Sequence, residues 1–258
     1  MDIYYKMKII LKGKSLKFLI ISDIHSNFEA LKCVIEEIKR DSFDRIVCLG
    51  DIVGYGPQPD ECVKFIRNNS VVSITGNHER MLFNPSLRIY ANVNARRAIE
   101  WTDGIISVSS REFLEKLPVF LKDEEKRISF VHGSPCDPDE YIFKISVALR
   151  SIEKIKNENI RLCFFGHTHI PGIIDEDGNL YYEENVTMAL DFRRYYLINP
   201  GSVGQPRDRD PRASFCVFDD AKNTVKFYRR EYNISKTVEK IEEYGLPLEL
   251  GERLWYGV

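Results

Sequence analysis

Short apolar runs that end in metal-ligating residues constrain the fold of this chain more than any other feature. Residues 18–21 run into Asp23 and His25, and residues 46–49 run into Asp51. Three later runs are followed in the same way by Asn77, His78, His132, His167 and His169. Each run has the length of a β-strand, and in open α/β sheets ligands bind just beyond the carboxyl ends of the strands. The runs therefore predict strand ends that carry a binding site.

Amphipathic segments between these runs predict helices, and their alternation with strands indicates an α/β fold with helices outside a sheet. The predicted helices begin after His25 and at Pro59, with further helices over residues 110–117, 144–156 and 235–244. Ser26 and Glu29 have the spacing of a capping box, so Ser26 is expected to cap the first helix. An extended chain points residues two apart to the same side, so Asp23 and His25 are expected to converge.

The second half of the chain has a different pattern of apolar runs. Residues 173–182 predict a β-hairpin that turns at Asp177 and Gly178. The strand-like runs after residue 160 also lie closer together, at residues 162–165, 195–198, 215–218 and 225–228. This spacing predicts a second, more antiparallel sheet packed on the first.

Length and composition predict one domain and exclude several classes of partner. With 258 residues and no linker or repeat, the chain is expected to form a single domain over residues 1–258. Within it, residues 1–16 are expected to be an N-terminal extension and residues 84–106 a helical insertion near the site. The formal net charge of −2 provides no basic field for a stable nucleic-acid partner.

The same composition predicts a location away from the membrane. No segment approaches the roughly 18 apolar residues needed to cross a bilayer. Lysines interrupt the N-terminal apolar residues, which argues against a signal peptide. The six cysteines lack a CxxC pair and are expected to be reduced thiols, so the expected location is the cytoplasm, with no membrane partner.

The residues at the strand ends include more metal ligands than one ion needs. All five histidines of the chain follow an apolar run. A single buried His is often structural, but a structural role does not explain five histidines and two acids at the same strand ends. Seven side chains are oxygen or nitrogen donors: Asp23, His25, Asp51, Asn77, His132, His167 and His169. A hydrolytic metal site typically uses three protein ligands. Seven donors therefore suit two ions, an arrangement used in phosphoryl chemistry, and a single-metal hydrolase would leave several of them unexplained.

These motifs resemble those of the calcineurin-like metallophosphoesterase superfamily. The matching elements, in order, are Asp23-x-His25, Gly50-Asp51, Gly76-Asn77-His78-Glu79, His132 and Gly166-His167-x-His169. Residues 197–208 also resemble a compact prokaryotic, phosphodiesterase-like branch of the superfamily. One departure is Glu79, which stands where the superfamily usually has Asp, at a position behind the metal ligands. The resemblance implies an α/β (α+β) fold, a four-layer α-β-β-α sandwich of two mixed β-sheets flanked by helices.

The resemblance also implies a role for each motif residue. Asp23, His25 and His169 would hold one metal ion, and Asn77, His132 and His167 would hold a second. Asp51 would bridge the two ions, and His78 would face the leaving group without ligating metal. The implied reaction is hydrolysis of a phosphodiester or phosphoanhydride by a metal-bridged hydroxide, with His78 as general acid and no covalent phosphoenzyme.

The metal and the substrate are predicted only as classes. Mixed oxygen and nitrogen ligation suits two divalent ions, with Mn²⁺ as the first expectation and Fe, Zn²⁺, Ni²⁺ or Co²⁺ as further candidates. The expected partner is a small phosphorylated substrate, nucleotides included, and a homo-oligomer is left open. Two alternatives remain: a phosphomonoesterase or protein phosphatase of the same superfamily, and a non-catalytic scaffold of the same fold that binds protein partners. The presence of all seven ligands and His78 argues against the scaffold.

Two residues outside the motifs are candidates for substrate contact. Arg207 lies in the Arg-rich segment 205–212, and a guanidinium suits phosphate recognition, although a solvated loop of Arg–Asp pairs is an equal alternative. Tyr55 follows Asp51 in a Gly-Tyr-Gly-Pro turn and could overhang the metals, whereas turn geometry alone is the commoner explanation. The predicted insertion 84–106 either shapes specificity or covers the edge of a sheet.

Overall fold

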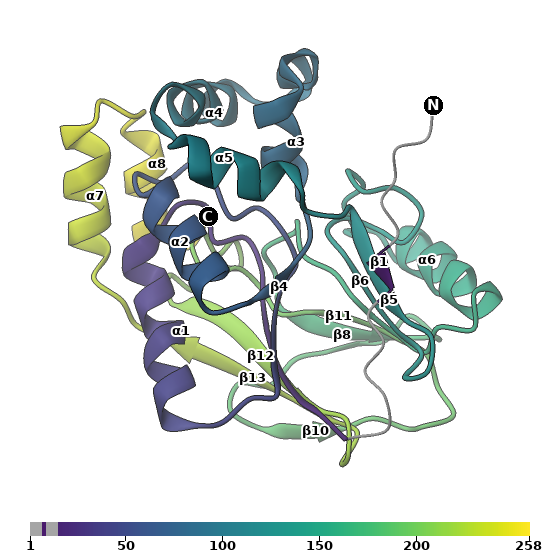
Figure 1. Ribbon diagram of the computed structural model, residues 1–258. Coiled ribbons are helices and arrows are strands. Elements are labelled where there is room, and N and C mark those ends of the chain that lie inside the picture. The colour runs from purple at the N-terminus through teal and green to yellow at the C-terminus, as the bar shows by residue number, and fades with distance from the viewer. Residues whose placement is uncertain (1–6, 9–14) are drawn as a thin grey trace.

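The structure is a computed structural model that describes residues 7–8 and 15–258. Most of the extension expected over residues 1–16 therefore lies outside the described residues. Two β-sheets pack face to face, and helices cover the outer face of each sheet (Figure 1). This arrangement confirms the predicted four-layer sandwich of two mixed sheets.

The first sheet has six strands and combines early and late parts of the chain. Its order is β10 (Thr187–Ala189), β13 (Thr224–Arg230), β12 (Ala213–Asp219), β2 (Lys17–Ile21), β3 (Arg45–Cys48) and β4 (Val72–Ser73). β2, β3 and β4 run parallel, whereas β12 pairs antiparallel with β2 through the register Cys216↔Ile20. β13 and β10 extend the antiparallel half of this sheet.

The second sheet is built in the same mixed way. Its order is β1 (Met7–Lys8), β5 (Phe120–Asp123), β6 (Ile128–Val131), β7 (Leu162–Phe164), β11 (Tyr196–Asn199), β8 (Gly172–Asp175) and β9 (Leu180–Tyr181). β6, β7 and β11 are parallel, and β8 and β9 form the predicted hairpin, in which the Gly178 N–H donates to the Asp175 carbonyl at 3.0 Å. The expectation that late strands form a separate, more antiparallel sheet is wrong, because the chain returns after residue 212 to pair β12 with the free edge of β2.

Three apolar layers hold the sandwich together. Between the sheets, Phe18 and Phe218 stack with ring centroids 5.9 Å apart, inside a cluster that contains side chains from both sheets. On the outer face of the first sheet, α1 (Phe28–Arg40) and α2 (Pro59–Asn68) bury Leu31 and Ile66. On the outer face of the second, α6 (Ile145–Asn157) buries Ile152. Close packing of this kind fixes the two sheets relative to each other, and with them the loops at their edges.

The remaining helices lie around one end of the sandwich. They are α3 (Asn77–Phe83), α4 (Val93–Ile105), α5 (Val108–Glu115), α7 (Ile234–Glu243) and α8 (Glu249–Glu252), with 3₁₀ turns η1 (Pro85–Tyr90) and η2 (Arg253–Trp255). The segment 84–106 thus contains η1 and α4. A fourth apolar cluster joins α4 to α7 and α8 through Ala98, Ile241 and Leu250.

The cap of the first helix differs from its prediction. Asn27, not Ser26, caps α1, and its side-chain oxygen accepts a hydrogen bond from the Ala30 N–H at 3.1 Å. Ser26 donates its backbone N–H to the Ile52 carbonyl and has a φ of 53°, outside the β-region that an N-cap residue normally adopts. Ser26 therefore belongs to the segment that contacts the loop after β3, and α1 begins only after Asn27.

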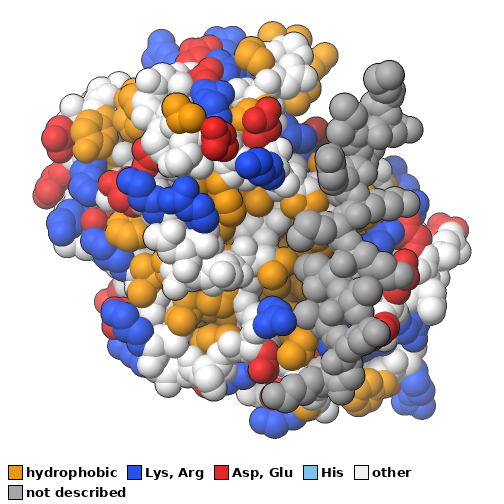
Figure 2. All heavy atoms as spheres, viewed as in Figure 1, with side chains coloured by type: hydrophobic (Ala, Val, Ile, Leu, Met, Phe, Trp, Pro, Cys, Tyr) orange, Lys and Arg blue, Asp and Glu red, His pale blue; other side chains and the backbone are white. Residues whose placement is uncertain are grey.

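The face of the molecule that Figure 2 shows has no large surface patch of one charge sign. Lys and Arg side chains are interspersed there with Asp and Glu, in keeping with the net charge of −2. Among the described residues, no helix has both the length and the apolar character that crossing a bilayer requires. All six cysteines are free thiols.

Candidate metal centre

The seven predicted ligands follow the carboxyl ends of strands from both sheets. The first sheet supplies Asp23 and His25 after β2, Asp51 after β3 and Asn77 after β4, and the second supplies His132 after β6 and His167 and His169 after β7. All are buried except the half-buried Asn77. The structure therefore brings all seven side chains together where the strand ends of the two sheets meet.

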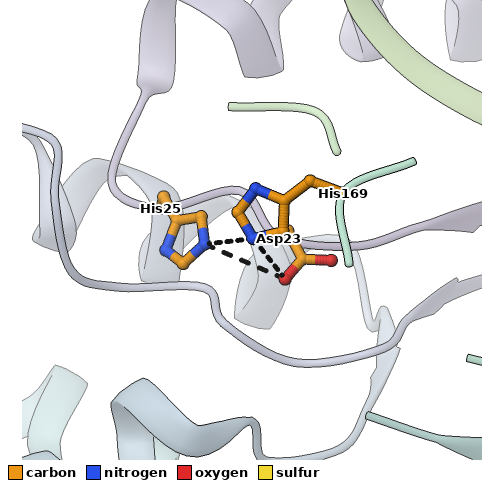
Figure 3. Close-up of side chains that lie close together, drawn as sticks. All are labelled: Asp23, His25 and His169. Carbon is orange, nitrogen blue, oxygen red and sulfur yellow. Dashed lines mark hydrogen bonds and ion pairs between the residues drawn. The ribbon is translucent and has the colours of Figure 1, made fainter. Parts of the chain in front are cut away.

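Asp23, His25 and His169 form the first group of ligand atoms (Figure 3). Asp23 Oδ1 lies 3.2 Å from His169 Nε2 and 3.8 Å from His25 Nε2, and the two ring nitrogens are 3.1 Å apart. Asp23 Oδ2 accepts a hydrogen bond from the His167 N–H at 3.1 Å, whereas Oδ1 accepts none from any described residue. A buried carboxylate oxygen without a donor is costly unless a cation neutralises it.

Asp51 lies between this group and a second one. Its Oδ1 is held by the His78 backbone N–H at 2.8 Å, so Oδ2 is the oxygen that faces the site. Oδ2 is 3.6 Å from His25 Nε2 and 3.4 Å from His132 Nε2. His132 Nε2 is also 2.9 Å from Asn77 Oδ1, and His167 lies with Asp51 and His132 in one cluster. One carboxylate oxygen thus faces both groups of ligands.

Backbone carbonyls orient four of the histidines. His25 Nδ1 donates to the Val53 carbonyl at 3.3 Å, and His132 Nδ1 donates to the Leu49 carbonyl at 2.8 Å. His169 Nδ1 donates to the Gln205 carbonyl, and His167 Nε2 donates to the Asp139 carbonyl at 3.2 Å. A carbonyl that holds one ring N–H directs the lone pair of the other nitrogen, as is usual for histidines that ligate metal.

The backbone at the site is in an unusual conformation. Five of the seven ligands have φ in the left-handed region: Asp23 (53°), His25 (49°), Asp51 (51°), His167 (65°) and His169 (61°). Such residues cost of order 1–3 kcal/mol each and cluster at functional sites. They also show that the argument from an extended chain for Asp23 and His25 is wrong. The two side chains converge because the chain coils after β2, not because it continues as a strand.

Burial and mutual charge decide the protonation of the site. Burial would raise the pKa of Asp51, but the positive charge of His132 holds it well below its usual value. Burial would lower the pKa of His132, but the Asp51 charge raises it to about 9. Burial lowers the pKa of His167 to about 3 and also lowers that of His25. Without metal, the cluster therefore keeps a proton on His132, which a cation would have to displace because metal ligands must be deprotonated.

Glu79 supports the loop that carries Asp51. Its two carboxylate oxygens accept hydrogen bonds from the backbone N–H groups of Asp51, Val53 and Gly76 at 2.8–3.0 Å. Burial, together with the nearby Asp51 charge, raises the pKa of Glu79 to about 7. The longer Glu side chain therefore fits the position where Asp is usual, and it contacts backbone instead of the ligand atoms.

His78 differs from the other histidines. Its Nδ1 has no hydrogen-bond partner among the described residues, although the side chain is buried. Gly54 makes room for the ring, because a Cβ there would lie 2.0 Å from His78 Nδ1, and its φ of 93° also favours glycine. Burial lowers the pKa of His78 to about 4, against the opposing charge of Asp51. The ring is thus neutral and is not fixed by a carbonyl as the four other histidines are.

The two predicted substrate-contact residues lie beside the ligands. The Tyr55 ring centroid is 4.7 Å from that of His25 and 4.5 Å from that of His78. The Arg207 guanidinium lies over Tyr55 at 5.8 Å, and the Arg207 N–H donates to the His169 carbonyl at 3.4 Å. Arg207 makes no ion pair with a described acid but donates to Gln205 Oε1 at 2.8 Å. The alternative of a solvated loop of Arg–Asp pairs therefore does not hold for this residue.

A cavity of about 360 Å³ opens next to the ligands. Its walls include Asn77, His78, His167, Tyr55 and Tyr141, together with Leu87, Tyr90 and Asn92 from the segment 84–106. The Tyr141 ring stacks on His167 with centroids 3.7 Å apart. The segment 84–106 thus forms one wall of a pocket that reaches the ligand atoms.

The residues present fit two divalent cations. Asp23 Oδ1 is buried without a hydrogen-bond donor, and it lies with Asp51 Oδ2 and the inward-facing nitrogens of the oriented histidines in clusters whose atoms are within 4.8 Å of one another. Neutral imidazole and carboxylate are the donor types that suit Mn²⁺, Fe and Zn²⁺. An oxygen shared by both groups, as Asp51 Oδ2 is, suits a bridging ligand.

Several residues at the site were not predicted from the sequence. Gln205 connects His169 to Arg207, and Tyr141 covers His167, yet neither was singled out. Gln205 lies inside the segment 197–208 that resembles the phosphodiesterase-like branch, which is a usable signal. Tyr141 stands nine residues after His132 in a loop with no recognisable motif, so only the structure places it.

Comparisons with known proteins agree with this geometry. Residues 16–223 match the model of the calcineurin-like phosphoesterase superfamily domain. The uncharacterized protein MJ0912 of Methanocaldococcus jannaschii is 42% identical over 242 residues, covering 92% of this chain and 97% of that protein. The crystal structure of a metallophosphoesterase from Sphaerobacter thermophilus is similar with a TM-score of 0.82 and 36% identity, covering 95% of this chain and 100% of that one.

A more distant similarity links the chain to enzymes named for a nucleotide substrate. The symmetrical bis(5′-nucleosyl)-tetraphosphatase of Pseudomonas fluorescens is 26% identical over 116 residues, which cover 44% of this chain and 40% of that enzyme. The chain spans about half or less of the length of the tetraphosphatases that it matches.

Proposed function

The chain belongs to the calcineurin-like phosphoesterase superfamily, and from that premise we propose that it hydrolyses a phosphodiester or phosphoanhydride at a two-metal centre. The observation that carries the proposal is the position of Asp51 Oδ2, which faces His25 on one side and His132 on the other. A carboxylate oxygen between two groups of ligands suits a pair of ions better than a single one.

The proposed ligand sets follow the two groups. Asp23, His25 and His169 would hold one ion, and Asn77, His132 and His167 the other, with Asp51 bridging. Two bound divalent ions would lower the pKa of a shared water and neutralise charge on the phosphoryl oxygens. Mn²⁺ remains the first candidate. The carbonyls that orient the four histidines would keep this arrangement preorganised.

His78 is the proposed general acid. It lies beside the ligands, and no carbonyl directs its ring toward a metal. A neutral His78 cannot donate a proton to a leaving alkoxide, so the substrate must first raise its pKa. The negative charge of a phosphoryl group next to the ring would do so, because an opposite charge favours the imidazolium.

The substrate is proposed to be a small phosphorylated molecule, with nucleotides as the first class to test. The cavity of about 360 Å³ beside His78 is large enough for part of such a leaving group. The names of the distant relatives, which are tetraphosphatases of bis(5′-nucleosyl) compounds, support a phosphoanhydride. Tyr55 and Arg207 are the proposed substrate contacts.

The proposal is tested by a screen of the Mn²⁺-reconstituted protein. The substrates are bis-p-nitrophenyl phosphate, p-nitrophenyl phosphate and a series of dinucleoside polyphosphates, and Asp51→Asn serves as the inactive control. We expect hydrolysis of the diester and of the anhydrides. Turnover of only p-nitrophenyl phosphate would favour a phosphomonoesterase, and no turnover of any substrate would favour a non-catalytic scaffold.

A further inference from the structure

Arg253 and Arg207 approach the same aromatic ring, that of Tyr55 beside the candidate site. The Arg253 guanidinium carbon is 6.0 Å from the Tyr55 ring centroid, and that of Arg207 is 5.8 Å from the same ring. Both arginines are half-buried. Among the described residues, no Asp or Glu side chain forms an ion pair with either one, whereas the half-buried Arg212 pairs with Asp210 and the buried Arg229 with Asp208.

The C-terminal segment is fixed in the place that brings Arg253 to the site. Leu250 and Leu254, on either side of Arg253, are buried in the apolar cluster with Tyr55. The tail also contacts the Arg207 loop directly, because the Arg209 N–H donates to the Gly257 carbonyl at 2.8 Å. A Cβ at Gly257 would lie 2.6 Å from the Asp210 backbone, so this contact is close. The position of Arg253 is therefore set by packing.

Two guanidinium groups held together this way repel each other. Burial lowers the pKa of Arg253, and the charge of Arg207 lowers it further. The Arg207 N–H donates to the His169 carbonyl at 3.4 Å, which places the Arg207 backbone directly beside a predicted ligand. The Arg253 Nε donates to a main-chain oxygen of Val258, the last residue of the sequence, and the terminal nitrogens of Arg253 are left for another acceptor. Guanidinium groups in this arrangement suit a phosphate, which accepts forked hydrogen bonds.

We propose that Arg207 and Arg253 form an anion site that binds a second phosphate group of the substrate, next to the phosphate that is cleaved. The inference rests on the proposed function and narrows it, because it selects substrates with at least two phosphates over simple diesters. Arg253 lies beyond residue 223, where the match to the family model ends, so the family match itself does not include this residue.

The anion site is tested first by binding. Calorimetry with Mn²⁺ present would measure pyrophosphate and, separately, inorganic phosphate binding to the wild type, Arg253→Gln and Arg209→Gln. Arg209 is an exposed residue of the same loop, so its variant removes the same charge without touching the site. We expect Arg253→Gln to weaken pyrophosphate binding about tenfold or more, as loss of a charged hydrogen bond would, and phosphate binding much less. Arg209→Gln should resemble the wild type.

Activity then connects the site to the substrate. We expect kcat/KM for a dinucleoside polyphosphate to fall at least ~tenfold more in Arg253→Gln than kcat/KM for bis-p-nitrophenyl phosphate, mostly through KM. Equal losses on both substrates, or equal pyrophosphate affinity in wild type and variant, would overturn the anion site. Should Arg253→Gln fail to fold, a wild type that binds pyrophosphate no more tightly than phosphate would overturn it too. If the wild type hydrolyses no substrate but Arg253→Gln still weakens pyrophosphate binding, the result refutes the proposed function and leaves the anion site supported.

Discussion

His78 and the four carbonyl-held histidines show how single residues at this site are prepared for different tasks. A ring whose N–H donates to a carbonyl, as in His132, presents a fixed lone pair and suits a ligand. His78 has no such partner: its ring packs against Tyr55 and Gly54, and its Nδ1 makes no hydrogen bond with a described residue.

Replacement of His78 by Ala should therefore separate catalysis from metal binding. We expect both ions to be retained, and turnover of a substrate with a poor leaving group to fall by about 10²–10⁴-fold, the typical contribution of general acid catalysis. A p-nitrophenyl ester, whose leaving group needs little protonation, should lose much less. Steady-state kinetics and metal analysis of the same preparation provide both numbers. Full activity on the poor leaving group would show that His78 is not the acid.

Asp51 offers the corresponding test of the ligands. Because Oδ2 faces both groups, Asp51→Asn should weaken both ions together, and metal analysis after dialysis should find neither ion at full occupancy. Asp139→Asn is the matched control, since the Asp139 carboxylate pairs with Arg80 and only its backbone carbonyl contacts His167. Loss of a single ion in Asp51→Asn would argue against a bridging role.

The sequence indicates these residues but not what positions them. Asp23, His25 and the later motif residues are recognisable because they follow apolar runs in a fixed order. Every peptide unit, in contrast, has a carbonyl, so the sequence does not indicate which carbonyls will contact a histidine. Only the folded chain shows that those of Val53, Leu49 and Gln205 do. The sequence also does not indicate the left-handed φ of Asp23, because an Asp residue is compatible with an extended backbone as well.

At the scale of elements, Asp60 connects the helices α2 and α5. Asp60, in the first turn of α2, accepts hydrogen bonds from the Ser107 N–H at 3.2 Å and from the Ser107 hydroxyl at 2.6 Å, and also from the Ser110 hydroxyl. Ser107 is in turn the N-cap of α5. Burial tends to raise the pKa of Asp60, but these hydrogen bonds outweigh it and lower the pKa below 3.8.

This connection predicts a pH-dependent loss of stability for Asp60→Ala. We expect the free energy of unfolding to fall by about 1–2 kcal/mol at pH 7, where the wild-type carboxylate is ionised. Because the pKa is lower in the folded state, the contribution is complete above the unfolded-state value near 3.8 and is lost as the pH falls through the folded-state value. Urea unfolding of both proteins between pH 7 and pH 3 should show the difference shrinking.

Glu61→Ala provides the control for this prediction. Glu61 is exposed on the same helix and makes no hydrogen bond or ion pair with another described residue through its side chain. Its replacement should change stability by no more than about 0.5 kcal/mol at any of these pH values. A difference for Asp60→Ala that stays constant from pH 7 to pH 3 would contradict the assignment to an ionised carboxylate.

Most elements were predictable from local pattern, and the exceptions have physical causes. The helix predicted over 144–156 is α6, Ile145–Asn157, because its apolar positions repeat at helical spacing. β5 and β10 were missed because neither is an apolar run: β5 contains Lys122 and Asp123, and β10 begins with Thr187 and is largely exposed. The pairing of β12 with β2 joins segments nearly 200 residues apart, which local pattern cannot indicate.

At the scale of the whole molecule, the candidate site depends on both sheets. β2, β3 and β4 present Asp23, Asp51 and Asn77, while β6 and β7 present the histidines that complete each group. Without cations, the cluster places two buried carboxylates and several lone pairs against one another, an arrangement that opposes the packing of one sheet on the other. Bound metal should therefore stabilise the entire sandwich and not only the loops that contact it.

Removal of metal tests this connection between site and fold. Each ion held at 100 times its dissociation constant would stabilise the native state by about 2.7 kcal/mol, and two independent ions by about twice that. For a chain of this size, the two ions together correspond to a rise in Tm of about 10–20 °C. Treatment of the Mn²⁺-loaded wild type with EDTA should lower Tm by that amount in a scanning calorimetry experiment, and renewed Mn²⁺ should restore it. Asp51→Asn, measured in parallel, should be nearly insensitive to EDTA because it has lost the ligand common to both groups. An unchanged Tm in the wild type would mean that these buried side chains are compensated within the protein and do not form a metal centre.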